Sequence, residues 1–125
     1  MALSRIAKQH AAEIRNHDWS DAPYRIDRAG HSREDDRGKR TVEQLSPGET
    51  DRIRLNVIWT TAQVLAYNDP NFNVHEFAEA AGAPGYLLYR SDGKPSGGIA
   101  AGLRIRYDED ANPTGPWMPG LPLRL

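Results

Sequence analysis

The sequence predicts a small, mainly α-helical domain with one β-hairpin, an α+β fold that is followed by an extended C-terminal arm. Three features carry this prediction: a long helix-like stretch at 47–67, two β-rich stretches around a glycine-rich turn, and prolines at every third residue near the C-terminus. The chain has 125 residues, 38% of them hydrophobic and 26% charged, which suits one domain with one small core. We expect that domain at 1–107, with a polar, loop-rich connection at 18–46, and the arm at 108–125.

The first predicted helix covers 2–17, because apolar and small residues recur there at three- and four-residue spacing. The residues expected on its buried face are Leu3, Ile6, Ala7, His10 and Ile14. The helix should end near Trp19, before the turn-forming stretch 20–23. Between 27 and 40 large apolar residues are absent and charges of both signs alternate, which is typical of a solvated loop or an ion-paired surface helix.

The main helix is predicted to start at Pro47 and to end at about Tyr67. Ser46 at the cap, Pro47 at the first helical position and Glu49 at the third form a strong start signal. Apolar residues cover two sides of this helix, with Ile53, Val57, Val64 and Tyr67 on one side and Leu55, Ile58, Trp59, Ala62 and Leu65 on the other. The helix should therefore be central, with Trp59 largely buried.

The stretch 68–71 should stop the main helix, and Asn73 should cap a short helix that Gly82 closes. Beyond it, 86–89 and 102–107 have the composition of strands, and 91–98 reads as the turn between them. The sequence thus predicts a hairpin with these two strands.

A DNA-binding alternative uses the same region. The stretch 77–84 resembles the first helix and turn of a helix-turn-helix motif, and if Pro84 opened a second helix, that helix would face a major groove. The predicted nucleic-acid contacts are Tyr86, Tyr89, Arg90, Lys94, Arg104 and Arg106, and the last four give the hairpin the charge of a basic wing. Whether 84–90 is helix or strand stays open on the sequence.

Two groups of titratable residues have spacings that would allow metal binding or acid/base catalysis. His10, Glu13 and His17 share one face of the first helix and would suit a transition metal, but that face is apolar and favours a partly buried, structural His10. His31 has Ser32, Asp35 and Asp36 as sequence neighbours, but nothing apolar nearby would desolvate them, as acid/base catalysis usually requires. We expect no catalytic residue, no metal and no cofactor.

The overall charge and the absence of cysteine narrow the function further. Sixteen basic and seventeen acidic residues leave a net charge of -1, so no global electrostatic attraction to nucleic acid or membranes is expected. The chain has no cysteine, which excludes disulfides, thiolate metal sites and a cysteine nucleophile. The longest nearly apolar run, 57–67, is too short to span a bilayer, so we expect a cytoplasmic protein without a membrane partner.

The C-terminal arm is the most informative feature. Pro113, Pro116, Pro119 and Pro122 recur with the period of a polyproline II helix. Five large apolar residues stand among them: Trp117, Met118, Leu121, Leu123 and Leu125. Exposed together, they would form an adhesive patch, so either the arm folds back on its own core or it docks into a protein partner or a neighbouring copy. In the second case these five, with Trp19 and Tyr24, are the predicted partner-binding residues.

The chain also resembles a group of proteins in its amino-acid composition and in two short stretches of sequence. It has thirteen arginines to three lysines, is rich in alanine, glycine and aspartate, and contains the stretches 18–25 and 67–72. In these features it resembles the small accessory proteins encoded by actinobacterial, mycobacteriophage-like phages. The resemblance implies a non-enzymatic protein that binds a host or phage factor in the bacterial cytoplasm. The alternatives are a helix-turn-helix or winged DNA-binding regulator and, third, a structural component of the virion.

Overall fold

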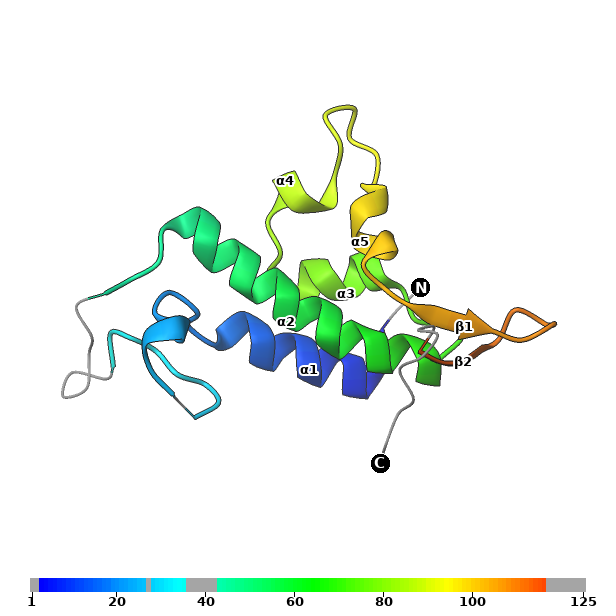
Figure 1. The fold of residues 1–125 in the computed structure, drawn as a ribbon, viewed down its shortest axis with the longest axis horizontal. Helices are drawn as coiled ribbons and strands as arrows, with labels where there is room; N and C mark the ends of the chain where they lie inside the picture. The colour runs from blue at the N-terminus through cyan, green and yellow to red at the C-terminus, as the bar shows by residue number, and fades with distance from the viewer. Residues whose placement is uncertain (1–2, 27, 36–42, 117–125) are drawn as a thin grey trace.

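The computed structural model describes residues 3–26, 28–35 and 43–116, and its fold is mainly helical with a two-stranded antiparallel hairpin, as predicted (Figure 1). The helices are α1 (Arg5–Asn16), a 3-10 turn η1 (Ala22–Tyr24), α2 (Pro47–Asn68), α3 (Val74–Ala80), α4 (Gly85–Leu88) and α5 (Gly97–Ala101). The strands are β1 (Ile105–Tyr107) and β2 (Pro113–Pro116).

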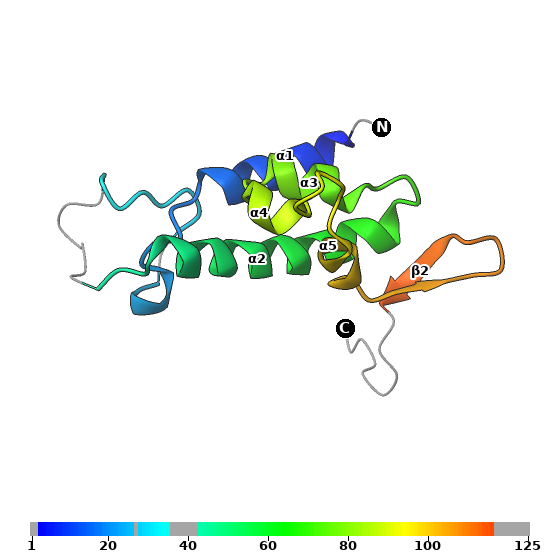
Figure 2. The ribbon, with the colours of Figure 1, turned by 90° about the horizontal axis from the view of Figure 1, so that it is seen from above.

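Helix α2 is the axis of the molecule, and its start is the one that the sequence predicts. The Ser46 hydroxyl accepts a hydrogen bond from the Glu49 N–H at 3.2 Å, while the Glu49 carboxylate accepts one from the Ser46 N–H at 3.0 Å. This reciprocal pair satisfies two N–H groups that the first turn leaves without helical partners. Figure 2 shows α1 and α2 side by side, with the hairpin at one end of α2 and η1 near the other.

The core lies where α1, α3, α4 and α5 cover α2. Its buried residues are Ala7, Ala11, Ile14, Leu55, Ile58, Ala62, Phe77, Ala78, Ala81, Ala83, Leu88 and Ile99. Half of these are alanines, whose small side chains allow the helices to approach closely. Trp59 is partly buried and packs against this core.

The buried face of α1 agrees with the predicted one in part, because Ala7 and Ile14 are buried and Leu3 packs against the core as predicted. Ala11 is also buried, while Ile6 and His10 differ from the prediction: Ile6 is 53% exposed and His10 is exposed. The His10 ring nitrogen Nδ1 lies 2.8 Å from the Ile6 carbonyl oxygen, within its own helix. The correction has a packing reason, because the close contacts with α2 and α3 favour alanine over the larger side chains that the pattern selected.

The predicted strand at 86–89 is also corrected. Gly85–Leu88 forms one turn of helix, because Leu88 has to turn into the core, where it is 2% exposed. Tyr89 then makes a single antiparallel bridge with Pro95, so the turn predicted between them is present. Strand β1 pairs with β2 instead, with Ile105 opposite Pro116 and a bulge between Arg106 and Tyr107.

The second strand therefore comes from the segment predicted to be the arm. Pro113 and Pro116 lie in β2, where a missing N–H is tolerated because the strand is at a sheet edge. The rest of the predicted arm, 117–125, lies outside the described residues. Among the helices of the described part, none has both the length and the apolar character needed to cross a bilayer.

Candidate functional site

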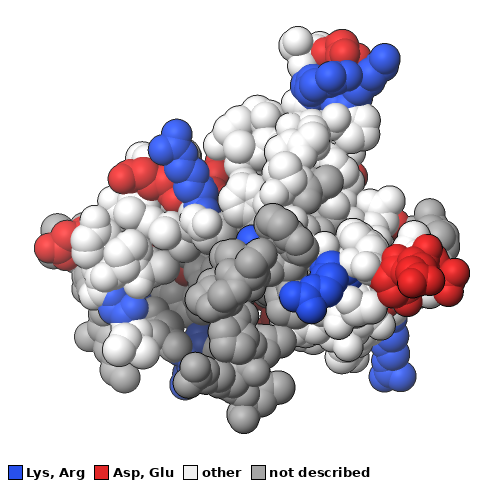
Figure 3. All heavy atoms as spheres, turned by 45° about the vertical axis from the view of Figure 1, so that its right-hand side comes forward, with Lys and Arg blue, Asp and Glu red and all other residues white. Residues whose placement is uncertain are grey.

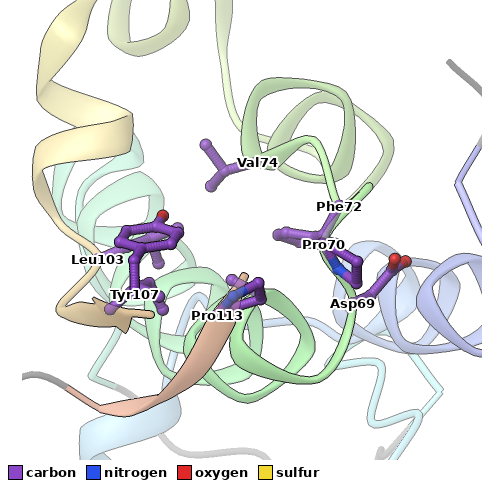
Figure 4. Close-up of a pocket in the computed structure, with 9 residues that line it drawn as sticks. Asp69, Pro70, Phe72, Val74, Leu103, Tyr107 and Pro113 are labelled. Carbon is purple, nitrogen blue, oxygen red and sulfur yellow. The ribbon is translucent and has the colours of Figure 1, made fainter. Parts of the chain in front are cut away.

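The candidate site is a groove of about 350 Å³ at the hairpin end of α2, lined mainly by apolar side chains (Figure 4). The lining residues come from the end of α2, the α2–α3 loop, the start of α3 and both strands: Ala66, Asp69, Pro70, Phe72, Val74, Leu103, Ile105, Tyr107 and Pro113. Figure 4 shows Phe72 and Pro70 facing Leu103 and Tyr107 across the opening, with Val74 at one end and Pro113 at the other. Asp69 supplies the one charge among these residues.

One wall of the groove, at Phe72, is continuous with the core. The ring of Phe72 lies 5.5 Å from that of Phe77, tilted by 52°, and Phe77 is fully buried in α3. Such tilted ring pairs are favourable beyond the area that they bury. One wall is thus anchored firmly, because any movement of Phe72 would disturb the packing of Phe77.

The opposite wall is held to α2 by a side-chain clamp. The Gln63 amide nitrogen donates to the Arg104 carbonyl, and the Arg104 N–H donates to the Gln63 amide oxygen at 2.8 Å. The amide of Gln63 thus pairs with this backbone as a neighbouring strand would. Two residues before Arg104, Gly102 lies against Trp59, whose indole N–H donates to the Ile99 carbonyl at 3.1 Å.

The outer rim of the groove is the hairpin itself. Tyr107 lines the groove and is 60% exposed, which leaves an aromatic face for a ligand. The turn that follows closes with the Asp108 N–H donating to the Asn112 carbonyl at 2.9 Å, and Ala111 takes the left-handed φ of 62°. The side chain of Asp108 accepts two further N–H bonds in this turn, from Asp110 and Asn112.

A buried ionic cluster lies at the other end of the molecule, where the sequence predicted a solvated loop around His31. Asp21 is fully buried and His31 is 6% exposed. The Arg33 guanidinium donates to the Asp21 carboxylate at 2.8 Å, and that of Arg25 lies 3.5 Å from the same carboxylate. The predicted environment of His31 is therefore wrong: its acidic neighbour is Asp21, not Asp35, which is exposed.

The geometry of this cluster fits a structural role better than a role in acid/base catalysis. Nη2 of Arg25 lies 2.6 Å from Nδ1 of His31, and because a guanidinium has no acceptor, Nδ1 must be the acceptor. The other ring nitrogen, Nε2, lies 3.4 Å from the Asp21 carboxylate. Both ring nitrogens thus face groups within the cluster, and Nδ1 is not offered to a nucleophile.

Asp18 holds this loop in place through its backbone. Its carboxylate accepts the Ser20 N–H at 3.0 Å and the Arg33 N–H at 2.9 Å. Partial burial acts to raise the pKa of Asp18, but the hydrogen bonds from Ser20 and Arg33 outweigh it, so the pKa lies below its usual range. Hydrogen bonds to the ionised form thus stabilise the loop.

The predicted nucleic-acid residues come from three parts of the chain: Tyr86 lies on α4, Tyr89, Arg90 and Lys94 lie between α4 and α5, and Arg104 and Arg106 lie at β1. The Tyr86 hydroxyl donates to Asp51 at 3.1 Å and the Tyr89 hydroxyl to Glu79 at 2.9 Å, and the bond to Glu79 raises the pKa of Tyr89. Arg90 pairs with Asp92 at 3.2 Å. In Figure 3 the basic side chains of the α4–α5 loop lie far from the acidic group at the hairpin turn, and no continuous basic surface covers this face.

The remaining predicted residues are spread over the fold. Trp19 donates its indole N–H to the Ile14 carbonyl at 3.0 Å and contacts the ring of His17 at 4.2 Å, so it closes the end of α1. Trp19 also lines a second hollow, of about 370 Å³, and Tyr24 is 46% exposed. Among the residues that the structure describes, no three acidic or histidine side chains gather in a way that would hold a metal ion.

The five predicted apolar contacts of the arm, Trp117, Met118, Leu121, Leu123 and Leu125, lie outside the described residues. Sequence reasoning missed the groove, because its walls are separated by about thirty residues of chain and come together only through the hairpin. A usable signal was Phe72-Asn73-Val74, an apolar pair beside a helix cap, where exposed polar residues would be expected.

Comparison with known proteins gives no family assignment. The chain matches no known protein family, and no curated protein or solved structure matches it.

Proposed function

We propose that this protein is a non-enzymatic binding protein that recognises another protein through the hairpin end of the molecule. The observation that carries the proposal is the apolar groove, beside which β2 continues into a segment with five large apolar residues. Apolar surface gathered at one place on a small protein is typical of an interaction site. The resemblance to phage accessory proteins extends the proposal to a host or phage factor in a bacterial cytoplasm.

The other described residues also support binding over catalysis. Two arginines close the buried ionic cluster around Asp21 and His31. The groove itself is lined mostly by apolar side chains, with the Tyr107 hydroxyl and the Asp69 carboxylate as the polar side-chain groups. Its chemistry suits recognition of apolar side chains.

The proposal is tested by photo-cross-linking in the full chain. A photoreactive phenylalanine derivative replaces Tyr107 in the groove or, as the matched control, Tyr86 on α4, which is 65% exposed. We expect a specific protein adduct from position 107 and not from 86. The adduct partner, once purified, should bind Tyr107→Asp at least about tenfold more weakly than wild type, which is about 1.4 kcal/mol. Equal labelling at both positions, or unchanged affinity, would contradict the proposal.

DNA binding has less support, because α4 is a single turn and is too short for a recognition helix that spans a major groove. Fluorescence anisotropy with random duplexes at low salt tests it directly. We expect no binding up to protein concentrations on the order of tens of micromolar, where nonspecific DNA-binding proteins are detected. If binding is seen, removal of Arg104 or Arg106 should lower the salt slope by about one.

A further inference from the structure

We propose that the groove is a docking site for an extended segment rich in leucine and proline, and that its occupant is residues 117–125 of the same chain. The inference deepens the proposed function, because it names what fills the groove when no partner is bound. It rests on that function only in using the same groove.

The lining of the groove suits such a segment. Phe72 and Tyr107 present aromatic rings, Pro70 and Pro113 add flat apolar surface, and Val74 lies at one end (Figure 4). Aromatic-lined grooves bind proline-containing segments well, because an extended segment with fixed φ angles loses little entropy on binding. A volume of about 350 Å³ is enough for a few side chains, and not for a folded domain.

The segment starts beside the groove. Pro116 is the last described residue and pairs with Ile105, which is a lining residue. Nine residues follow, and at about 3.4 Å per extended residue they reach roughly 30 Å. The groove is therefore within reach of the first few of these residues, without any movement of the hairpin.

The chemistry of the segment complements that of the groove. Pro119 and Pro122 are the prolines of the segment, as a proline-binding groove requires. Leu121, Leu123 and Leu125 supply apolar side chains of a size that the groove can hold. Arg124 is the one charged side chain in 117–125, as Asp69 is among the lining residues, and the two charges are opposite.

The connection within one chain decides between this occupant and a second copy. A short connection gives an effective concentration in the millimolar range, well above the concentration of a second copy in a dilute solution. The groove should therefore be filled from within the chain in the purified protein.

The chain lacks cysteine, so engineered disulfides test the docking without background. The full-length double variant Val74→Cys/Leu121→Cys places one thiol in the groove and one in the segment. The matched control is Arg52→Cys/Leu121→Cys, because Arg52 is exposed on α2 and lies about 21 Å along the helix from Ala66. Under mild oxidation of dilute protein, mass spectrometry measures how fast the disulfide forms within one chain.

We expect the groove pair to close at least about tenfold faster than the control pair, as monomer. A second groove pair, Tyr107→Cys/Leu123→Cys, uses a mostly exposed position and guards against misfolding of the first, which circular dichroism checks. If neither folded groove pair closes faster than the control, the docking inference is wrong. If the product is a dimer, the occupant is a second copy and the assignment to the same chain is overturned.

This experiment uses the purified protein alone, so its outcome is independent of the photo-cross-linking result. A fast disulfide together with equal labelling at positions 107 and 86 would leave the docking intact and contradict the proposed function. A disulfide that forms no faster than in the control, together with labelling at position 107 and not at 86, would contradict the docking and leave the proposed function intact.

Discussion

At the residue scale, Gly102 is a position where the absence of a side chain is needed. A Cβ at this position would overlap the indole ring of Trp59, whose N–H is bonded to Ile99. The glycine therefore allows the chain to pass from α5 to β1 directly over the indole. The groove depends on this approach, because Leu103 and Ile105 follow at once.

Gly102→Ala should therefore destabilise the protein by about 1–3 kcal/mol, the usual cost of overpacking. The control is Gly48→Ala, because a Cβ at Gly48 meets nothing within 4 Å in the first turn of α2. Urea denaturation of both variants measures the difference. An unchanged midpoint for Gly102→Ala would show that Trp59 moves aside at little cost.

Asp21 is the second residue whose role is decided by its surroundings. Fully buried, it faces Arg25, His31 and Arg33. Removal of one partner from a buried ion pair leaves an uncompensated charge, which is costly even where the pair itself adds little stability.

Asp21→Asn should cost about 3–5 kcal/mol in the free energy of unfolding, by the same argument. Asp35→Asn, at an exposed position nearby in the sequence, should change it by less than about 0.5 kcal/mol. Chemical denaturation compares the two. A small effect of Asp21→Asn would mean that the cluster tolerates a neutral amide in place of the carboxylate.

At the scale of elements, the hairpin depends on helix α2. Two strands by themselves are marginally stable in water, so the contacts of β2 with α2 and the Gln63 clamp must hold them. Thr114 adds a hydrogen bond from its hydroxyl to the Arg106 carbonyl at 3.2 Å across the pair. The groove keeps its shape as long as these contacts hold.

Gln63→Met keeps the length of the side chain but removes both hydrogen bonds to Arg104. We expect a loss of about 1–2 kcal/mol, since each such bond contributes roughly 0.5–1.5 kcal/mol. Hydrogen exchange should show the Arg104 amide exchanging faster than in wild type. Gln9→Met, at an exposed site on α1, is the matched control, and equal exchange in both variants would contradict the clamp.

At the scale of the whole molecule, α2 joins two ends of different chemistry. One end carries the buried ionic cluster and the other carries the groove. Figure 1 shows the hairpin that forms part of the groove at one end of α2. Acid should weaken the ionic end, where the folded state favours the ionised form of Asp18.

The pKa of Asp18 decides the direction in which pH changes the stability of this end. This pKa is lowered in the folded state, so the contribution of Asp18 to stability is present above the unfolded value and is lost as the pH falls through the folded pKa. Wild type should therefore be more stable than Asp18→Asn at neutral pH, and the difference should shrink below about pH 4, the ordinary range of an aspartate. Urea denaturation from pH 7 to pH 3 measures it, and a difference that does not depend on pH would contradict this role.

Local signals were sufficient for the ends of the main helices. The Ser46 cap with Pro47 and Glu49 correctly predicted the start of α2, and Asn73 correctly predicted the cap of α3, where its side chain accepts the Glu76 N–H. Such signals act within one turn of chain, so no tertiary information is needed to find them. They were enough to predict the fold class.

The sequence by itself determined a mainly helical domain around α2 and a reversal of the chain near the hairpin, because caps, periodicity and turns are local. Only the tertiary structure decided the pairing of β1 with β2, the helical turn at Leu88 and the burial of Asp21 with His31. In each of these cases the local preference is weak, and the free energy comes from contacts with distant residues. The same reason hid the groove, whose two walls become neighbours only when the hairpin packs on α2.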